Sequence, residues 1–288
     1  MTTQHARIAV IGGSGLYNMP SITDKTEVIL ETPFGKPSAP IVIGTVQGKR
    51  VAFLPRHGVG HTYSPSSVPY RANAYALRML GVRFVLGVSA CGSLRESYEP
   101  GNIVIPHQLL DFTKLWRERT FFETGIVAHV SIADPFTAEL RTLLFEAVQA
   151  VGGTVHPHGT YITIEGPRFS TRAESLTYRQ WGCDIIGMTT SPEAQLCAEA
   201  QMAYAVMAHV TDYDVWRETG ESVTNQMVIE TMKRNLGLTQ KALQVAIDQL
   251  DETLDLPVHQ QLETALLTAP EAQSVELREK LSAIFSTD

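Results

Sequence analysis

Cysteine is scarce in this 288-residue chain, and no hydrophobic run is long enough to cross a membrane. The cysteines, Cys91, Cys183 and Cys197, are odd in number and lack Cys-x-x-Cys spacing, which disfavours a disulfide framework and a zinc ribbon. No apolar stretch approaches the ~20 residues of a transmembrane helix, and the N-terminus lacks the basic start of a signal peptide. We therefore expect a cytoplasmic protein with no membrane partner.

Positive charge is also in short supply. Lys and Arg number 23 against 30 Asp and Glu, which gives a formal net charge of −7. A chain of this sign is a poor partner for nucleic acid. The histidines show no spacing typical of a metal site. An anionic substrate would have to be held by local arginines and backbone amides.

The chain does contain short Val- and Ile-rich runs that alternate with helix-like segments. The runs suit buried strands and cover 7–12, 40–46, 51–55, 83–89, 102–106, 160–166, 183–188 and 203–210. Helical patterns occupy 69–81, 137–153, 191–201 and 222–254. This alternation predicts a layered α/β protein. We expect one domain over residues 1–254 and a C-terminal helical extension over 255–288, with a helical pattern at 271–285, packed on its own subunit or on a neighbour.

Polar or ligand-like residues follow several of the predicted strands: Ser14, Arg56, His57, Ser89, Phe169, Met188, Thr189, Asp212 and Asp214. In open α/β sheets ligands bind at the carboxyl ends of the strands, so these groups would converge if the strands are parallel. Each also has an ordinary interpretation. "GGSG" and "RHG" can be surface turns, Ser89 can reflect tight packing, and Phe169 and Met188 can be core residues. Their co-occurrence at strand ends favours a site.

The residue types indicate an oxyanion beside a heterocycle. Hydroxyls, a guanidinium and an imidazole are suited to phosphate, and the set comprises Ser14, Ser89, Thr189, Arg56 and His57. Asp212 and Asp214, in "VTDYDVW" (210–216), can accept hydrogen bonds from a base. With a pKa raised by burial, one of them can donate a proton to a ring nitrogen. Together these groups suggest a nucleobase that leaves while an oxyanion attacks.

Several motifs in order resemble the 5′-methylthioadenosine phosphorylases, in the trimeric branch of the purine nucleoside phosphorylase superfamily: "IGGSGLY", "TPFGKPS", "RHGVGH", "SACGSLRE", "TIEGPRFSTRAES", "MTTSPEA" and "TDYDVW". The resemblance implies a three-layer α/β/α fold with a central mixed, mostly parallel twisted sheet. It also implies a homotrimer without metal or organic cofactor. The implied reaction is reversible phosphorolysis of 5′-methylthioadenosine to adenine and 5-methylthioribose 1-phosphate, a step of purine and methionine salvage.

The resemblance also implies a role for individual residues. Those at the family's phosphate positions are Ser14, Arg56, His57, Ser89, Ala90 and Thr189. Met188 would border the ribose, Phe169 would stack on the base, and Asp212 and Asp214 would face the 6-amino group and N7. The implied catalytic residues are Asp214, Asp212 and His57. The implied 5′-substituent pocket consists of Asn225, Val228, Ile229 and His129, the last reaching the neighbouring subunit's pocket.

The chain departs from the family pattern at a few positions. Ser14 and Ser89 stand where relatives often carry threonine, which preserves the hydroxyl. Asn225 stands where relatives often place an aliphatic residue. A polar group there would soften the preference for methylthio over hydroxyl, so we expect slower cleavage of adenosine as well.

Other functions remain possible at this stage. A 6-oxopurine nucleoside or methylthioinosine phosphorylase shares the fold, but its substrate would place an oxygen against a carboxylate. A hydrolytic nucleosidase would not need the phosphate set. A nucleoside- or phosphate-binding protein would need no catalytic acid, and a scaffold protein would leave the polar strand ends unexplained.

Overall fold

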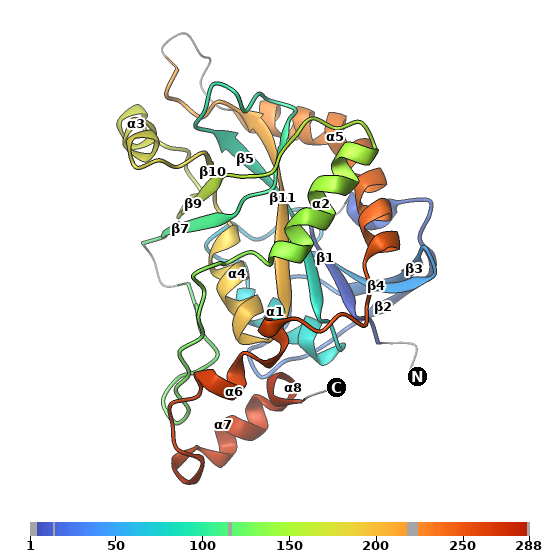
Figure 1. The fold of residues 1–288 in the computed structure, drawn as a ribbon, viewed down its shortest axis with the longest axis vertical. Helices are drawn as coiled ribbons and strands as arrows, with labels where there is room; N and C mark the ends of the chain where they lie inside the picture. The colour runs from blue at the N-terminus through green and yellow to red at the C-terminus, as the bar shows by residue number, and fades with distance from the viewer. Residues whose placement is uncertain (1–4, 14, 115–116, 218–223, 287–288) are drawn as a thin grey trace.

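The computed structural model describes residues 5–13, 15–114, 117–217 and 224–286. Within them a sheet of eleven strands forms the centre of the molecule (Figure 1). The strands are β1 (Ile8–Gly12), β2 (Thr23–Val28), β3 (Ile41–Val46), β4 (Lys49–Pro55), β5 (Phe84–Ser93), β6 (Ile103–Val104), β7 (Gln108–Phe112), β8 (Val155–His156), β9 (Thr160–Ile164), β10 (Ile185–Gly187) and β11 (Ala203–Asp212).

Five longer helices accompany the sheet, and short helical turns make up the tail. The longer helices are α1 (Tyr70–Met79), α2 (Ala138–Ala150), α3 (Arg172–Gln180), α4 (Thr190–Glu199) and α5 (Asn225–Gln249). The short elements are η1 (Leu16–Asn18), η2 (Pro257–Gln260), α6 (Leu262–Ala265), η3 (Pro270–Ala272), α7 (Val275–Lys280) and α8 (Ser282–Phe285). In the part of the chain that the structure describes, no helix combines the length and the apolar character needed to cross a bilayer.

The sheet is mixed, with a parallel centre. β4, β1, β5 and β11 lie side by side and run parallel. β2 and β3 extend one edge in antiparallel pairs, whereas β10, β9 and β7 extend the other. The expected mixed, mostly parallel sheet is therefore confirmed, and its carboxyl-end edge is where the parallel centre presents its loops.

Alternating side chains of the central strands face two separate helical layers. In β1, Ala9 and Ile11 pack in the cluster that contains α1 and α4, whereas Ile8 and Val10 pack in the cluster that contains α2 and α5. Successive residues of a strand point to opposite faces, so a run apolar at every position is buried on both sides. α2 and α5 lie against each other over one face (Figure 1). These are the three layers that were expected.

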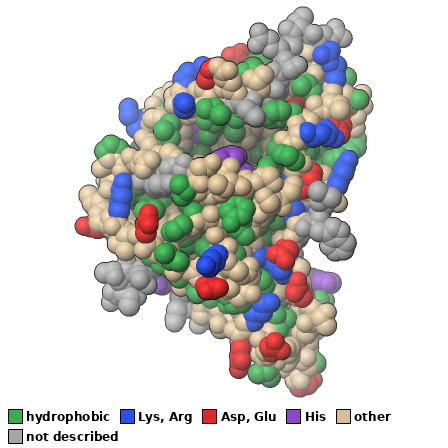
Figure 2. Space-filling model, turned by 180° about the vertical axis from the view of Figure 1, so that it is seen from behind, with side chains coloured by type: hydrophobic (Ala, Val, Ile, Leu, Met, Phe, Trp, Pro, Cys, Tyr) green, Lys and Arg blue, Asp and Glu red, His purple; other side chains and the backbone are tan. Residues whose placement is uncertain are grey.

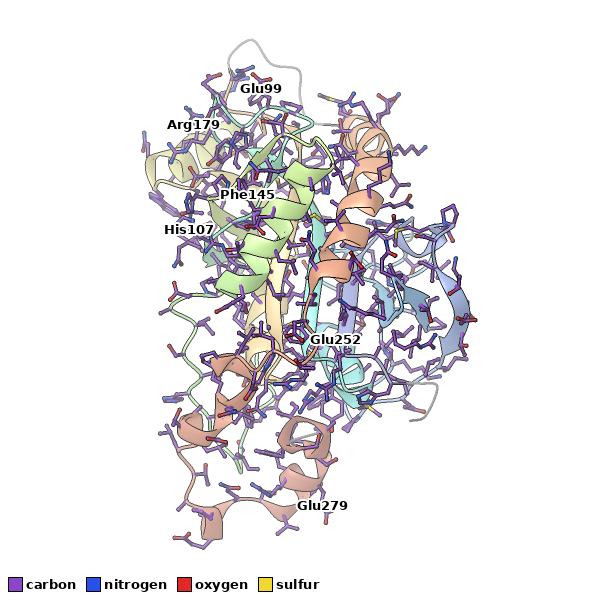
Figure 3. The ribbon with its side chains drawn as sticks, turned by 45° about the vertical axis from the view of Figure 1, so that its right-hand side comes forward. Glu99, His107, Phe145, Arg179, Glu252 and Glu279 are labelled. Atoms are coloured by element: carbon purple, nitrogen blue, oxygen red, sulfur yellow. The ribbon has the colours of Figure 1, made fainter. Side chains whose placement is uncertain are left out.

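The tail packs on its own chain, against α1. Leu281 and Ile284 are fully buried in the cluster that contains α1, and the Tyr75 hydroxyl donates a 2.7 Å hydrogen bond to the Lys280 carbonyl. The helical pattern at 271–285 is broken into η3, α7 and α8, and Val275 is 72% exposed. Figure 3 shows Glu279 of the tail at the opposite end of the molecule from Glu99 and Arg179.

All eight predicted runs contain strands, and the four predicted helices are present. The sequence patterns missed β2, β7, β8 and α3. β2, "TDKTEV", is an edge strand with five exposed residues, so it carries no apolar alternation. α3 is short and polar, and it begins with a capping box between Thr171 and Glu174, a local signal that the sequence does contain.

Candidate active site

A cavity of about 980 Å³ lies at the carboxyl-end edge of the parallel strands. Figure 2 shows a hollow in this face of the molecule, with histidine visible inside it. The predicted site residues that line the cavity are Arg56, His57, Ser89, Ala90, Phe169, Met188, Thr189, Asp212, Asp214, Val228 and Ile229. The structure thus brings together the polar groups that follow separate strands.

The assumption of parallel strands is wrong for two of the contributors, β10 and β9. β10 runs antiparallel to β5, with Ile186 opposite Gly92, and β9, which precedes Phe169, runs parallel to β10. β1 pairs with β5 only as far as Gly87, so the last residues of β5 extend beyond their neighbour. β10 pairs with this extension and runs back toward the cavity. Met188 and Thr189 therefore reach the cavity from the direction opposite to Ser89.

Arg56 is held at the floor of the cavity by a buried ion pair. Its Nε and Nη2 donate hydrogen bonds of 2.6 and 2.7 Å to the two carboxylate oxygens of Glu193. Nη1 donates to the Val88 carbonyl at 2.9 Å, and the Tyr204 hydroxyl donates to Glu193 at 2.8 Å. Burial alone would lower the pKa of Arg56, but the Glu193 carboxylate outweighs it and raises that pKa, so the guanidinium stays charged. Nη1 retains one N–H hydrogen that no described residue accepts.

His57 is a neutral ring with a fixed tautomer. Burial and the neighbouring Arg56 charge lower its pKa to about 4. Its Nδ1 lies 2.9 Å from the Tyr63 carbonyl, which only accepts, so Nδ1 carries the proton. The ring also stacks on His61, with centroids 4.3 Å apart. The remaining nitrogen, Nε2, is therefore a hydrogen-bond acceptor.

Ser89 and Thr189 supply hydroxyl groups to the cavity wall. Both are buried, and Thr189 makes no capping hydrogen bond to the helix that follows it. The Ser89 hydroxyl donates to the Ala90 carbonyl at 3.1 Å and lies 3.3 Å from the Tyr161 hydroxyl. The loop after β1 adds the backbone of Gly13 and Gly15 to the same cavity. It leads into the short η1 turn, not into an α-helix whose dipole would favour an anion.

The two carboxylates at the end of β11 differ in their hydrogen bonds. Asp212 accepts from the Thr211 hydroxyl at 2.6 Å and from the Asp214 backbone N–H at 2.8 Å. Burial raises the pKa of Asp212, and these hydrogen bonds limit the rise. Burial also raises the pKa of Asp214 to about 6, where the Asp212 charge adds to the effect and the Ser175 hydroxyl opposes it. Asp214 Oδ2 is buried without a hydrogen-bond partner in the described part of the chain.

The backbone around the carboxylates is closely fitted. A Cβ atom at Gly92 would lie 2.9 Å from Asp212 Oδ1, so only glycine lets β5 approach the carboxylate this closely. The Trp216 indole donates a 2.8 Å hydrogen bond to the Ser93 carbonyl and carries the Arg179 guanidinium 3.6 Å from its ring centroid. Trp216, which is not among the cavity-lining residues, therefore anchors the loop that carries the carboxylates to the end of β5.

Met188 and Phe169 are half-buried residues of the cavity wall. Arg117, whose side chain is fully buried, joins the segments that carry them. Its Nη1 donates to the Met188 carbonyl at 2.6 Å, and its Nη2 donates to the Glu165 carbonyl at 2.7 Å. One buried arginine thus fixes the loop before Phe169 against the loop after β10.

The N-terminal half of α5 forms an apolar wall. Val228 and Ile229 line the cavity as expected, and Met232 and Leu236 extend the same helix face. Ile229 is 52% exposed, so this wall is open to solvent in the single chain. The Thr224 hydroxyl caps the helix by accepting from the Met227 N–H.

The three remaining predicted site residues are Ser14, Asn225 and His129. Ser14 and the side chain of Asn225 lie outside the described residues. His129 is exposed on the segment between β7 and α2, and it does not line the cavity of its own chain. Its backbone N–H donates to the Ala265 carbonyl at 2.9 Å. No group of three or more His, Cys, Asp or Glu within the described ranges is arranged to hold a metal ion.

Residue patterns missed Glu193, Arg117 and Lys233, of which Lys233 lines the cavity from α5. A weak signal existed for Glu193, because this carboxylate shares a helix face with the apolar residues Leu196 and Cys197. Arg117 carried no local signal, since its partners are about 50 to 70 residues away in the sequence.

The chain belongs to the phosphorylase superfamily, whose family model matches residues 7–248. Among curated relatives, it is 50% identical over 279 residues to the S-methyl-5′-thioadenosine phosphorylase of Chloroflexus aurantiacus, with 97% of each chain covered. It is 52% identical over 266 residues to that of Hyperthermus butylicus, which covers 91% of this chain and 96% of the relative. The resemblance drawn from the motifs is confirmed.

Solved structures agree with this assignment. A methylthioadenosine phosphorylase from an antarctic soil metagenomic library superposes with a TM-score of 0.94 at 46% identity, covering 99% of this chain and all of that one. A methylthioadenosine phosphorylase from Schistosoma mansoni in complex with adenine superposes with a TM-score of 0.80 at 37% identity, covering 86% of this chain and 94% of that one.

Proposed function

We propose that this chain catalyses the reversible phosphorolysis of 5′-methylthioadenosine to adenine and 5-methylthioribose 1-phosphate. The proposal rests on one observation: the same cavity contains a group of anion-binding side chains, here called the anion cradle, and a buried acid. Arg56, His57, Ser89 and Thr189 lie on one part of the wall, and Asp214, with a pKa near 6, lies on another. Relatives at about half identity over nearly the whole chain carry the same activity in their names.

The cradle would hold phosphate below the ribose. The last N–H of Arg56 and the two hydroxyls would donate to phosphate oxygens, with the backbone amides of Gly13, Gly15 and Ala90 beside them. His57 Nε2 would accept a hydrogen bond from the protonated oxygen of monohydrogen phosphate, which orients an unprotonated oxygen toward the ribosyl carbon. We assign Ser14 to the same cradle from its position in the motif.

The reaction would break the bond between the ribosyl carbon and N9 of adenine and form a bond from that carbon to a phosphate oxygen. The electron pair of the broken bond goes to the base, and Asp214, when protonated, donates its proton to N7 so that adenine leaves neutral. The proton that phosphate loses as it becomes an ester balances this transfer. Positioned proton donation of this kind contributes a factor of ~10²–10⁴.

Base selection follows from the same carboxylates. Asp212, which is held by Thr211 and by the Asp214 backbone, would accept a hydrogen bond from the 6-amino group. A 6-oxopurine would place its oxygen against that carboxylate, and a buried pair of acceptors is strongly disfavoured. Phe169 would stack on the base, and Met188 would border the ribose.

The 5′-substituent would lie against α5. Val228, Ile229 and Met232 offer apolar contact to a methylthio group, and we assign Asn225 to the same pocket. We further propose a cytoplasmic homotrimer in which His129 reaches the neighbouring subunit's cavity, because His129 is exposed and away from its own. The reaction needs no metal or organic cofactor.

Adenine release from 5′-methylthioadenosine, with and without inorganic phosphate, tests the proposal. We expect release only with phosphate, and 5-methylthioribose 1-phosphate as the second product. Equal release without phosphate would show a hydrolase. Turnover of methylthioinosine in place of methylthioadenosine would overturn the role given to Asp212.

A further inference from the structure

We propose that Lys233 supplies the positive charge that attracts and retains phosphate in the cavity. Lys233 is an exposed residue of α5 whose side chain lines the cavity. The inference rests on the proposed phosphorolysis, since it adds a residue to the binding of that reaction's co-substrate.

The other charges of the cavity do not favour an anion. Asp212 and Asp214 are carboxyl groups, and the Arg56 guanidinium is neutralised by two hydrogen bonds to Glu193. A phosphate ion that entered this cavity would meet hydrogen-bond donors but no net positive charge from these residues. Of the lysine and arginine side chains that line the cavity, Lys233 has no carboxylate partner within the described ranges.

α5 places Lys233 close to the phosphate side of the cavity. One turn further along the helix, Leu236 lies against the loop after β1, with its Cδ2 3.3 Å from where a Cβ atom on Gly15 would be. The next turn contacts the same loop, because the Gln240 side chain donates to the Gly15 carbonyl at 3.1 Å. Residues three apart share a helix face, so Lys233 lies on the face that covers this loop.

A lysine at this position suits a co-substrate that must enter and leave. Its ammonium group is a point charge on a flexible four-carbon stem, unlike the fixed Arg56 guanidinium. In a chain of net charge −7, a local cation raises the concentration of a dianion at the cavity, and salt screens the effect.

The test compares Lys233→Gln, Lys233→Arg and the control Arg234→Gln. Arg234 is the adjacent cation on α5, lies outside the cavity lining and donates to the Thr231 hydroxyl. The phosphate dependence of adenine release is measured at saturating 5′-methylthioadenosine and several salt concentrations. We expect Lys233→Gln to raise the phosphate KM on the order of tenfold, as for a pair a few ångströms apart near a surface. The variant should also flatten the salt dependence of kcat/KM for phosphate and leave the nucleoside KM nearly unchanged.

Lys233→Arg should restore most of the phosphate affinity, and Arg234→Gln should match the wild type. Equal phosphate KM values for Lys233→Gln and Arg234→Gln would overturn the inference. A wild-type enzyme that releases adenine without phosphate would instead refute the proposed function, so the two failures are distinguishable. If Lys233→Gln does not fold, Lys233→Met keeps the aliphatic stem and answers the same question.

Discussion

The two walls of the cavity differ in how firmly their residues are held. On the strand-end wall, Arg56, Asp212 and Asp214 are 3%, 5% and 8% exposed. Arg56 is hydrogen-bonded to Glu193 of α4 and to the Val88 carbonyl of β5, and the Asp214 backbone N–H donates to Asp212. On the α5 wall, Ile229 is 52% exposed and contributes only apolar contact. Strand ends are fixed by the backbone ladders of the sheet, whereas the end of a helix is tied down mainly by side-chain packing. Breaking and forming bonds requires charged groups held in fixed positions, whereas recognition of an apolar substituent does not.

Asp214→Asn should produce the largest loss on the strand-end wall. The amide has nearly the shape of the carboxyl group but cannot act as an acid, so kcat for 5′-methylthioadenosine should fall by ~10²–10⁴-fold. Asp248→Asn, which changes an exposed carboxylate of α5, is the matched control and should retain the wild-type rate. A kcat for Asp214→Asn close to that of the wild type would contradict proton donation by this residue.

Among substitutions of the residues that support the strand-end wall, Glu193→Gln should destabilise the folded protein most. It leaves the buried Arg56 guanidinium without its counter-charge, which typically costs about 3–5 kcal/mol of unfolding free energy. Glu174→Gln removes the partner of Arg168, whose side chain is 62% exposed, and should cost far less. Urea unfolding of both variants measures the difference. Equal losses would mean that the Arg56–Glu193 pair contributes no more than a surface pair.

The sequence alone predicted the residues of the strand-end wall better than the residues that hold them in place. Asp212 and Asp214 follow one apolar run, and Arg56 and His57 follow another, so a local pattern marked each position. No local pattern indicates the direction of β10, because strand pairing depends on contacts between residues that are far apart in the chain. Even so, Met188 and Thr189 reach the cavity, since the extension of β5 gives β10 a partner there.

The supporting residues could not be predicted because their partners are distant. Glu193 lies 137 residues from Arg56, and a carboxylate in the first turn of a helix is unremarkable by itself. Arg117 joins two loops that no periodicity places together. Trp216 likewise donates to the Ser93 carbonyl, 123 residues away in the sequence, and no local pattern indicates that hydrogen bond.

Asp214 and His57 should shape the pH dependence of stability in opposite directions. Burial raises the folded pKa of Asp214 from 3.8 to about 6, so the native state binds more protons in that window. Its contribution to stability therefore falls as pH rises from about 4 to 6, by at most about 3 kcal/mol. The pKa of His57 is lowered from 6.5 to about 4, so its contribution rises over nearly the same window.

The Asp214→Asn substitution should reveal the contribution of His57 to the pH dependence of stability. We expect its unfolding free energy to rise more steeply between pH 4 and 6 than that of the wild type, as measured by denaturant unfolding at several pH values. His209, whose pKa burial also lowers to about 4, contributes to both proteins and cancels in the difference. Identical slopes would indicate that the folded pKa of Asp214 lies near its ordinary value.

The smallest expected effect belongs to the α5 wall. Ile229→Ser should lower kcat/KM for 5′-methylthioadenosine about tenfold, because a buried apolar contact with the methylthio group is lost. Adenosine, with a 5′-hydroxyl, should be cleaved more slowly than 5′-methylthioadenosine by the wild type, by ~10²-fold at most. The rate of adenosine cleavage should change less in the variant, so the ratio of the kcat/KM values for the two substrates should move toward one.

Val275→Ser, at a 72% exposed position of the tail, is the control. If kcat/KM falls equally for both substrates, Ile229 supports the position of α5 and does not recognise the 5′-substituent. The contrast between the two walls would then be weaker than their difference in exposure suggests.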